Sequence, residues 1–299
     1  MLKSIFLGDD AALNVRAVRP KRTPMPRNHG LLVLAAVIVS LVGCGDPAAS
    51  GLGSREGTTR IVNGVPTGSA YGNVGALMFD FASDGLDADD WFCSGSLIAP
   101  AVFLTAAHCL EFLPASAQVY VTFSPSAAEG VATAIPAKEF HFDPLYGHDQ
   151  SNPHDVGVVL LPAKRTRGIT PLQLPPAGYL DQLAEKNGLK DQKFLNVGYG
   201  GDVPTTGQPI VTYDGVRKVS TSTYMALEAN WLWLSMNAAT GNGGDCYGDS
   251  GGPKLLASNP KMVLALVVTG DAVCRATTKD YRVDSPSARA FLGAYVALS

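Results

Sequence analysis

The feature that most constrains the fold is a series of short apolar runs, each seven to ten residues long and bounded by glycine, proline or asparagine. Runs of this length suit β-strands, because the helices of globular domains need longer periodic segments. The chain has 32 glycines and 20 prolines, and only 16% of its residues are charged, which indicates many turns between strands. The runs that carry this prediction are 118–124, 154–163, 193–200, 230–238 and 261–270.

The side-chain pattern separates these strands from the end of the chain. Val119, Val121 and Phe123 alternate with polar residues and therefore share one face of a strand. Near the C-terminus, Ser285 offers a helix N-cap and Pro286 suits the first helical position. The apolar residues that follow at helical spacing are Ala288, Phe291, Leu292, Tyr295 and Val296. We therefore predict an all-β body with a C-terminal helix.

Residues 31–43 form an uncharged, mostly apolar run that is too short to span a bilayer comfortably but suits the core of a signal peptide. The alternative is a buried strand or helix of the fold. Basic residues before the run and the polar, loop-like segment 45–59 after it favour export. The 30 residues before the run are long for the start of a signal peptide, so we expect translation to begin at Met25. The predicted leader is 1–43.

Cys44 ends this apolar region and is one of five cysteines, so at least one cysteine lacks an intramolecular partner. The sequence Leu41-Val42-Gly43-Cys44 resembles a bacterial lipobox, in which cleavage before the cysteine leaves a thiol that receives a diacylglycerol. The alternatives are an ordinary signal peptide, a free thiol or an intermolecular disulfide. Residues 44–60 are small and polar and predict a flexible tether and activation peptide. In a bacterium the precursor would be a membrane-anchored lipoprotein, periplasmic or at the cell surface, or would be secreted.

The charge distribution bears on partners. Residues 1–60 hold eight of the 23 Lys and Arg residues but only four of the 26 Asp and Glu residues, so the rest of the chain is acidic. An acidic body argues against nucleic acid as a partner. The acidic segment 83–91 has oxygen ligands of the kind that calcium prefers, but it lacks the spacing of a calcium loop. We expect a solvated loop there, and neither a metal nor a cofactor.

Three motifs carry the chemistry. A serine hydroxyl is a poor nucleophile at neutral pH, so it needs a base to take its proton, and the base needs an acceptor that fixes its tautomer. The glycines around Ser250 allow the N–H groups of Gly248 and Ser250 to face a developing oxyanion, and one such donor is typically worth about 3 kcal/mol. The motifs are "LTAAHC" at 104–109, "HDVGVVLL" at 154–161 and "GGDCYGDSGGP" at 243–253.

These motifs resemble those of the chymotrypsin/trypsin family of serine endopeptidases, which share the same chain order of histidine, aspartate and serine. The resemblance implies that His108 is the general base, that Asp155 orients it and that Ser250 is the nucleophile, with an acyl-enzyme as intermediate. Asp143 and Asp149 are alternatives for the acid. We expect an exported, monomeric endopeptidase that acts on proteins or peptides. The alternative is a catalytically silent protein that binds other proteins at its cleft.

The resemblance extends from Ile61 to about Leu298 and also implies a fold. Members of the family have two packed six-stranded antiparallel Greek-key β-barrels and a C-terminal helix. Residues 61–170 would form mainly the first barrel, and residues 171–299 the second barrel and the helix. The family also pairs cysteines, and two disulfides would indicate an oxidising compartment. The implied pairs are Cys93 with Cys109, and Cys246 with Cys274.

The segment "TTRIVNG" at 58–64 resembles the activation junction of the family. Cleavage after Arg60 would create an α-ammonium on Ile61, and the family pairs this group with the acid before the nucleophile, here Asp249. The alternative is a first strand with a solvated Arg60. Because no remaining cysteine pair would link the tether to the body, the same cut would release a lipid-anchored precursor.

Substrate preference depends on the pocket beside the nucleophile. Trypsin-like members carry an aspartate six residues before the serine, where this chain has Gly244, with Asp245 next to it. Gly270, on the opposite wall, would leave the mouth of the pocket open. Two interpretations stay open: Asp245 attracts a substrate Arg or Lys side chain at P1, the residue before the cleaved bond, or Lys279 neutralises it. The first is the one that we expect.

Overall fold

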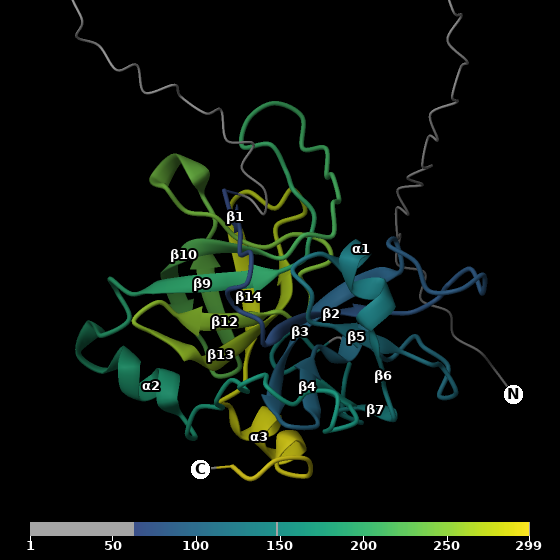
Figure 1. Ribbon diagram of the computed structural model, residues 1–299. Coiled ribbons are helices and arrows are strands. Elements are labelled where there is room, and N and C mark those ends of the chain that lie inside the picture. The colour runs from purple at the N-terminus through teal and green to yellow at the C-terminus, as the bar shows by residue number, and fades with distance from the viewer. Residues whose placement is uncertain (1–62, 148, 299) are drawn as a thin grey trace, which may run out of the picture. The chain divides into compact units, whose positions relative to one another are not determined.

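The computed structural model describes residues 63–147 and 149–298, which form two antiparallel sheets and a few short helices (Figure 1). The first sheet has seven strands in the spatial order β6-β5-β2-β3-β4-β8-β7. Its strands are β2 Val74–Met78, β3 Trp91–Ala99, β4 Val102–Thr105, β5 Tyr120–Thr122, β6 Ile135–Pro136, β7 Glu139–Phe142 and β8 Gly157–Leu160.

The second sheet follows later in the chain and closes on itself. Its order is β10-β11-β14-β13-β12-β9, and the additional pairing of β9 with β10 completes a six-stranded barrel. The two-residue strand β1, from the start of the described chain, adds to β10 at the edge. The strands are β1 Val65–Pro66, β9 Lys193–Gly198, β10 Lys218–Leu227, β11 Trp231–Ser235, β12 Pro253–Leu256, β13 Asn259–Gly270 and β14 Thr277–Arg282.

Helices are few, as predicted, and the last one begins where the sequence indicated. The Ser285 hydroxyl accepts a hydrogen bond from the Ala288 N–H, and Pro286 is the first helical residue. The helix ends at Leu292, so Tyr295 and Val296 lie in the turns that follow, although both still pack against the core. No helix in 63–147 or 149–298 is long and apolar enough to cross a membrane. The α-helices are α1 Ala127–Gly130, α2 Tyr179–Ala184 and α3 Pro286–Leu292. The 3-10 helices are η1 Ala107–Cys109, η2 Val131–Thr133, η3 Glu185–Asn187 and η4 Ala238–Thr240.

The predicted fold class is confirmed: the body is all-β, antiparallel and followed by a C-terminal helix. The two halves differ in one respect. The second half is a closed six-stranded barrel, whereas the first is a curled sheet of seven strands with β6 and β7 at its edges. Strand β6 is only two residues long and pairs with β5, so its ladder ends after two residue pairs.

The two sheets share a core and a buried arginine at their contact. Arg217, the residue immediately before β10, is 1% exposed. Its guanidinium donates hydrogen bonds to the carbonyl oxygens of Val74 and Phe123, both at 2.9 Å, and these belong to the first half of the chain. It also donates to the Ala70 carbonyl at 2.9 Å and to the Tyr199 hydroxyl at 3.2 Å. A planar guanidinium has five N–H donors, so one side chain can fasten several backbone segments together.

We therefore expect Arg217→Lys to lower the free energy of unfolding by about 2–3 kcal/mol, because an ammonium with three donors leaves buried carbonyl groups without partners. Urea denaturation followed by circular dichroism measures this loss. Arg165→Lys is the matched control, since the Arg165 guanidinium makes only an exposed contact with the Thr133 carbonyl. Equal stabilities of the two variants would contradict the role given to Arg217.

Candidate active site

His108 lies in η1, immediately after β4. The residue that follows it, Cys109, forms a disulfide with Cys93 of β3, with a Cα–Cα distance of 6.3 Å. This confirms the first of the two expected pairs. The disulfide fastens the histidine turn to the strand beside it, so His108 is held on the first sheet.

The His108 ring is bonded to a buried carboxylate. Its Nδ1–H donates to Asp155 Oδ2 at 2.7 Å, and the backbone N–H of His108 donates to Asp155 Oδ1 at 2.9 Å. The Asp155 side chain is only 4% exposed, whereas that of His108 is 28% exposed. A carboxylate at Nδ1 fixes the tautomer that leaves Nε2 free to accept a proton.

The two alternative acids are bound elsewhere. Asp143 Oδ2 accepts from His154 Nδ1 at 2.9 Å, and Asp149 Oδ1 accepts from the backbone N–H and the hydroxyl of Ser151. Asp155 is therefore the acid that the structure brings to His108.

Ser250 reaches this region from the second barrel, in the turn before β12. Its backbone carbonyl accepts a hydrogen bond from the Ser94 N–H of β3 at 2.9 Å, and the Ser94 hydroxyl donates to the Gly248 carbonyl at 2.9 Å. Gly248 has a φ of +97°, and a Cβ there would lie 2.6 Å from the Trp91 ring. Only glycine suits this position, because a side chain would be strained at this φ and would clash with Trp91 of β3. The glycine therefore lets the turn that carries Ser250 pack closely against β3.

Asp249, the residue before the serine, is 1% exposed. Its carboxylate accepts hydrogen bonds from the backbone N–H groups of Gly200 at 2.8 Å and Cys246 at 2.9 Å. Burial away from water, together with the charge of Asp245, raises the pKa of Asp249 to about 7. Of the other residues expected at the N-terminal side, Met25, Cys44, Arg60 and Ile61 lie outside the described residues.

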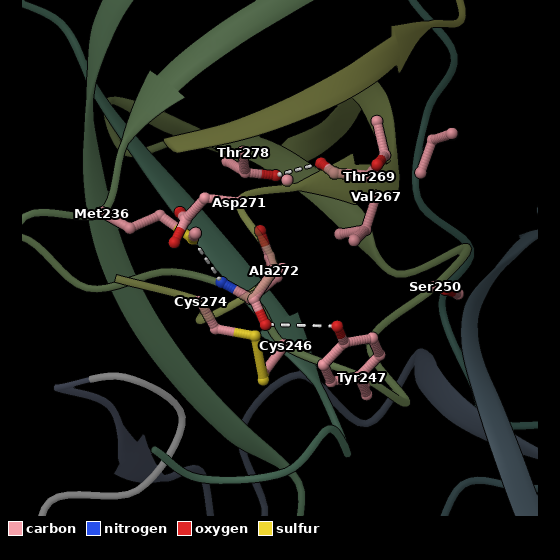
Figure 2. A pocket seen from close by; sticks show the side chains of 13 residues that line it. Met236, Cys246, Tyr247, Ser250, Val267, Thr269, Asp271, Ala272, Cys274 and Thr278 are labelled. Carbon is pink, nitrogen blue, oxygen red and sulfur yellow. Dashed lines mark hydrogen bonds between the residues drawn. A yellow bond between two sulfur atoms is a disulfide. The ribbon is translucent and has the colours of Figure 1, made fainter. Parts of the chain in front are cut away.

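A cavity of about 230 Å³ opens beside Ser250 (Figure 2). The disulfide between Cys246 and Cys274, with a Cα–Cα distance of 5.3 Å, forms part of its wall and confirms the second expected pair. Gly270 also lines the cavity, as expected. Met236 lies across the cavity from Ser250, and a Cβ on Gly244 would be 2.1 Å from the Met236 Cγ and Sδ atoms. Met236 therefore takes the space that a side chain at position 244 would need.

Asp245 has a partner that was not predicted from the sequence. Its Oδ2 accepts a hydrogen bond from the Lys254 ammonium, and the Lys254 side chain is fully buried. Lys279, the alternative partner of Asp245, instead places its ammonium over the Trp231 and Trp233 rings, 4.2 and 5.0 Å from their centroids. Residue spacing alone does not show which lysine faces inward, since that depends on strand pairing.

A second buried acid faces Lys254. The Asp280 side chain is 0% exposed, and its Oδ1 lies 3.5 Å from the Lys254 ammonium. Its other oxygen, Oδ2, is buried without a hydrogen-bond partner. Burial raises the pKa of Asp280 to about 8, although Lys254 acts to lower it. The sequence held one indication of this buried ion pair: Lys254 stands directly before the apolar pair Leu255-Leu256. A cation inside a buried strand needs a buried acid as its partner.

The acidic segment 83–91 is organised by its own backbone. Asp80, just before it, accepts from the N–H groups of Asp84 and Gly85, and Asp90 accepts from the N–H of Asp87. Near the active site, the ligand-type atoms of Cys93, His108 and Cys109 lie within 4.8 Å of one another. Because the two cysteines form a disulfide, they offer no thiolate to a metal.

Comparison with known proteins gives this geometry a family. The sequence model described as Trypsin matches residues 77–291 of this chain. The chain belongs to the trypsin family. Ovochymase of Halocynthia roretzi is 28% identical over 181 residues, which are 56% of this chain and 11% of that protein. Venom serine protease Bi-VSP of Bombus ignitus is 27% identical over 217 residues, which are 68% of this chain and 59% of that protein. This trypsin-family chain thus spans less than two thirds of either relative.

Solved structures share the trypsin-family fold at low sequence identity. A structure described as HL collagenase has a TM-score of 0.54 and 20% identity, and the match covers 79% of this chain and 98% of that one. The Vibrio cholerae VesB protease has a TM-score of 0.55 and 19% identity, and the match covers 77% of this chain and 66% of that one. Human heparin binding protein has a TM-score of 0.56 and 15% identity, and the match covers 80% of this chain and 99% of that one.

The raised pKa of Asp280 predicts a pH dependence of stability. The folded chain holds a proton on Asp280 up to about pH 8, whereas an unfolded aspartate loses it near pH 4, at about 3.9. This contribution to stability is complete below pH 4 and is lost as the pH rises to 8. Between pH 5 and 8 this proton makes the free energy of unfolding fall with pH by on the order of 1 kcal/mol per pH unit. We expect Asp280→Asn to remove that dependence. Urea denaturation at several pH values across this range measures the free energy of unfolding. The exposed control Asp84→Asn should keep the pH dependence of the wild type. The same pH dependence in Asp280→Asn would contradict the assignment to Asp280.

Proposed function

We propose that this trypsin-family chain is an active serine endopeptidase whose triad is His108, Asp155 and Ser250. The observation that carries the proposal is the short hydrogen bond from His108 Nδ1 to the buried Asp155 carboxylate. The turn bearing Ser250 is bonded to β3, the strand to which Cys109 is also cross-linked. The hydrogen bond to Ser250 and the disulfide to Cys109 both join to β3 the turns that carry Ser250 and His108. This arrangement supports a base and a serine nucleophile that act together.

The proposed mechanism has two halves, formation of an acyl-enzyme and its hydrolysis, and His108 acts as base and then as acid in each. His108 Nε2 takes the proton from Ser250 Oγ, which attacks the peptide carbonyl carbon, and the N–H groups of Gly248 and Ser250 stabilise the oxyanion. His108 then gives the proton to the leaving amine, and an acyl-enzyme on Ser250 remains. His108 then takes a proton from water, which attacks the acyl carbon, and returns that proton to Ser250 Oγ as the ester bond breaks and the carboxylic acid product leaves. Asp155 stabilises the imidazolium at each stage.

Activation by cleavage after Arg60 forms part of the proposal. The new ammonium of Ile61 would pair with the Asp249 carboxylate. Asp249 supports this role because it is buried and its pKa is raised to about 7, chiefly by desolvation. An adjacent cation would favour the charged carboxylate, so the ion pair would form at the residue that immediately precedes the nucleophile.

Export is proposed from the leader and the disulfides together. Two disulfides suit an oxidising compartment outside the cytosol. The leader 1–43 would direct the chain there, and lipidation of Cys44 would anchor the precursor through residues 44–60. Cleavage after Arg60 would then activate the enzyme and release it from the membrane in one step.

A catalytically silent binding protein is the alternative, and the fold by itself permits it. One solved neighbour is described as a heparin binding protein, whereas two others are described as a collagenase and a protease. The bond between His108 and Asp155 and the presence of Ser250 favour the active enzyme.

Labelling of Ser250 by a fluorophosphonate separates the two functions. This reagent reacts with a serine only when a neighbouring base activates it. We expect stoichiometric labelling of the full chain after limited digestion at Arg60, and none in Ser250→Ala treated in the same way. Absence of labelling in a folded, correctly cleaved wild-type protein would favour the silent binding protein.

The Arg60→Gln variant is the second arm of this experiment. It should leave an intact precursor that labels slowly and stays in the membrane fraction, whereas wild-type protein beginning at Ile61 should appear in a detergent-free supernatant. Rapid labelling of intact Arg60→Gln would contradict the activation step. Active enzyme that keeps its lipid after cleavage would contradict the release.

A further inference from the structure

Lys254 is a fully buried cation directly behind the cavity beside Ser250. It lies in β12, opposite Asn196 of β9 in the strand register, and its side chain is 0% exposed. The ammonium donates to the Asn196 amide oxygen at 2.7 Å and to the Asp245 carboxylate. Asp280 Oδ1 lies 3.5 Å from it on the remaining side.

Two of the three N–H donors of the ammonium are therefore hydrogen-bonded inside the barrel, to Asn196 and to Asp245. The anionic partner in direct hydrogen-bond contact with Lys254 is Asp245. Asp245 lines the cavity and is the acid that would otherwise attract a basic substrate side chain. In this chain, the carboxylate already binds a cation that belongs to the protein.

Two other acids near the cavity, Asp280 and Asp271, differ in charge. Burial raises the pKa of Asp280 to about 8, which keeps it neutral at pH 7. Asp271, also at the cavity, stays charged, because hydrogen bonds from the backbone N–H groups of Arg275, Ala276 and Thr277 at 2.8–3.0 Å outweigh its burial and lower its pKa. These N–H groups already occupy both of its carboxylate oxygens. With Asp245 paired to Lys254, an Arg or Lys side chain buried against Asp245 would lose its hydration without gaining an ion pair there.

The walls of the cavity suit an apolar side chain. Met236 covers the space above Gly244, and its Sδ accepts a hydrogen bond from the Asp245 N–H at 3.2 Å. Val267 and the Cys246–Cys274 disulfide supply further apolar surface around the cavity (Figure 2).

We propose that Lys254 gives Asp245 the cation that a basic P1 side chain would otherwise supply, so that the enzyme selects substrates with an uncharged, apolar residue at P1. This inference rests on the proposed peptidase function and replaces the basic preference expected from the sequence. Lys254 is thus a specificity-determining residue that acts from behind the cavity through Asp245.

The test compares peptide substrates that differ only at P1. The full chain is activated with immobilised trypsin, which is then removed, and active sites are counted by fluorophosphonate labelling. Ser250→Ala, treated identically, gives the background from any trypsin carried over. We expect kcat/KM per active site to be at least about tenfold higher for Leu or Phe than for Arg or Lys at P1.

Lys254→Met keeps the length of the side chain but removes the cation, which leaves Asp245 without a partner. The ratio of kcat/KM for Arg over Leu should then rise about 100-fold. Asp245→Asn combined with Lys254→Met removes both charges, and this double variant should keep the wild-type ratio. A wild-type preference for Arg, or an unchanged ratio in a labelled Lys254→Met enzyme, would overturn the proposal.

Binding of benzamidine, a small aromatic cation, tests the pocket without catalysis and without a variant. Isothermal titration calorimetry on the activated wild-type protein should show no binding at millimolar concentration, on the order of a Kd above 1 mM. Tight binding would overturn the proposal even if Lys254→Met fails to fold. Loss of fluorophosphonate labelling, by contrast, would contradict the peptidase function and leave the benzamidine result to decide the charge of the pocket.

Discussion

The contact between the two sheets is the constraint on which the rest of the site depends. His108 follows β4 and Asp155 precedes β8 of the first sheet, whereas Ser250 lies in a turn of the second barrel. At this contact the Ser94 N–H bonds the Ser250 carbonyl, and the Ser94 hydroxyl bonds the Gly248 carbonyl. Ser94 is fully buried, so water does not compete for these bonds. A base and a nucleophile on separate sheets can act together only if this contact is rigid.

Buried cations serve two different purposes in this fold. Arg217 binds carbonyl groups from several segments and joins the halves mechanically. Lys254 binds Asp245 and Asn196 and sets the charge behind the cavity. Both are expensive to desolvate, and both are satisfied by several acceptors at once, which is the condition under which a buried charge is tolerated. One cation therefore fixes the geometry of the site, and the other fixes its electrostatics.

The sequence predicted what depends on local pattern. The all-β class, the cap at Ser285 and, through the family resemblance, both disulfides agree with the structure. The partner of Asp245 was not predicted, because a separation of nine residues across the turn before β12 does not show which lysine faces the acid. Met236 was missed for a similar reason, since it fills the space beside Gly244 from another strand end. The open edges of the first sheet likewise follow from how short β6 is, which periodicity does not reveal.

Burst kinetics with an ester substrate measure whether the two sheets together form a working acylation site. Activated protein is mixed rapidly with a p-nitrophenyl ester, and the released nitrophenolate is followed before the steady state. We expect a burst of about one nitrophenolate per chain, with the acyl group found on Ser250 by mass spectrometry of the acid-quenched sample. Linear release from time zero, with no acyl group on Ser250, would contradict it.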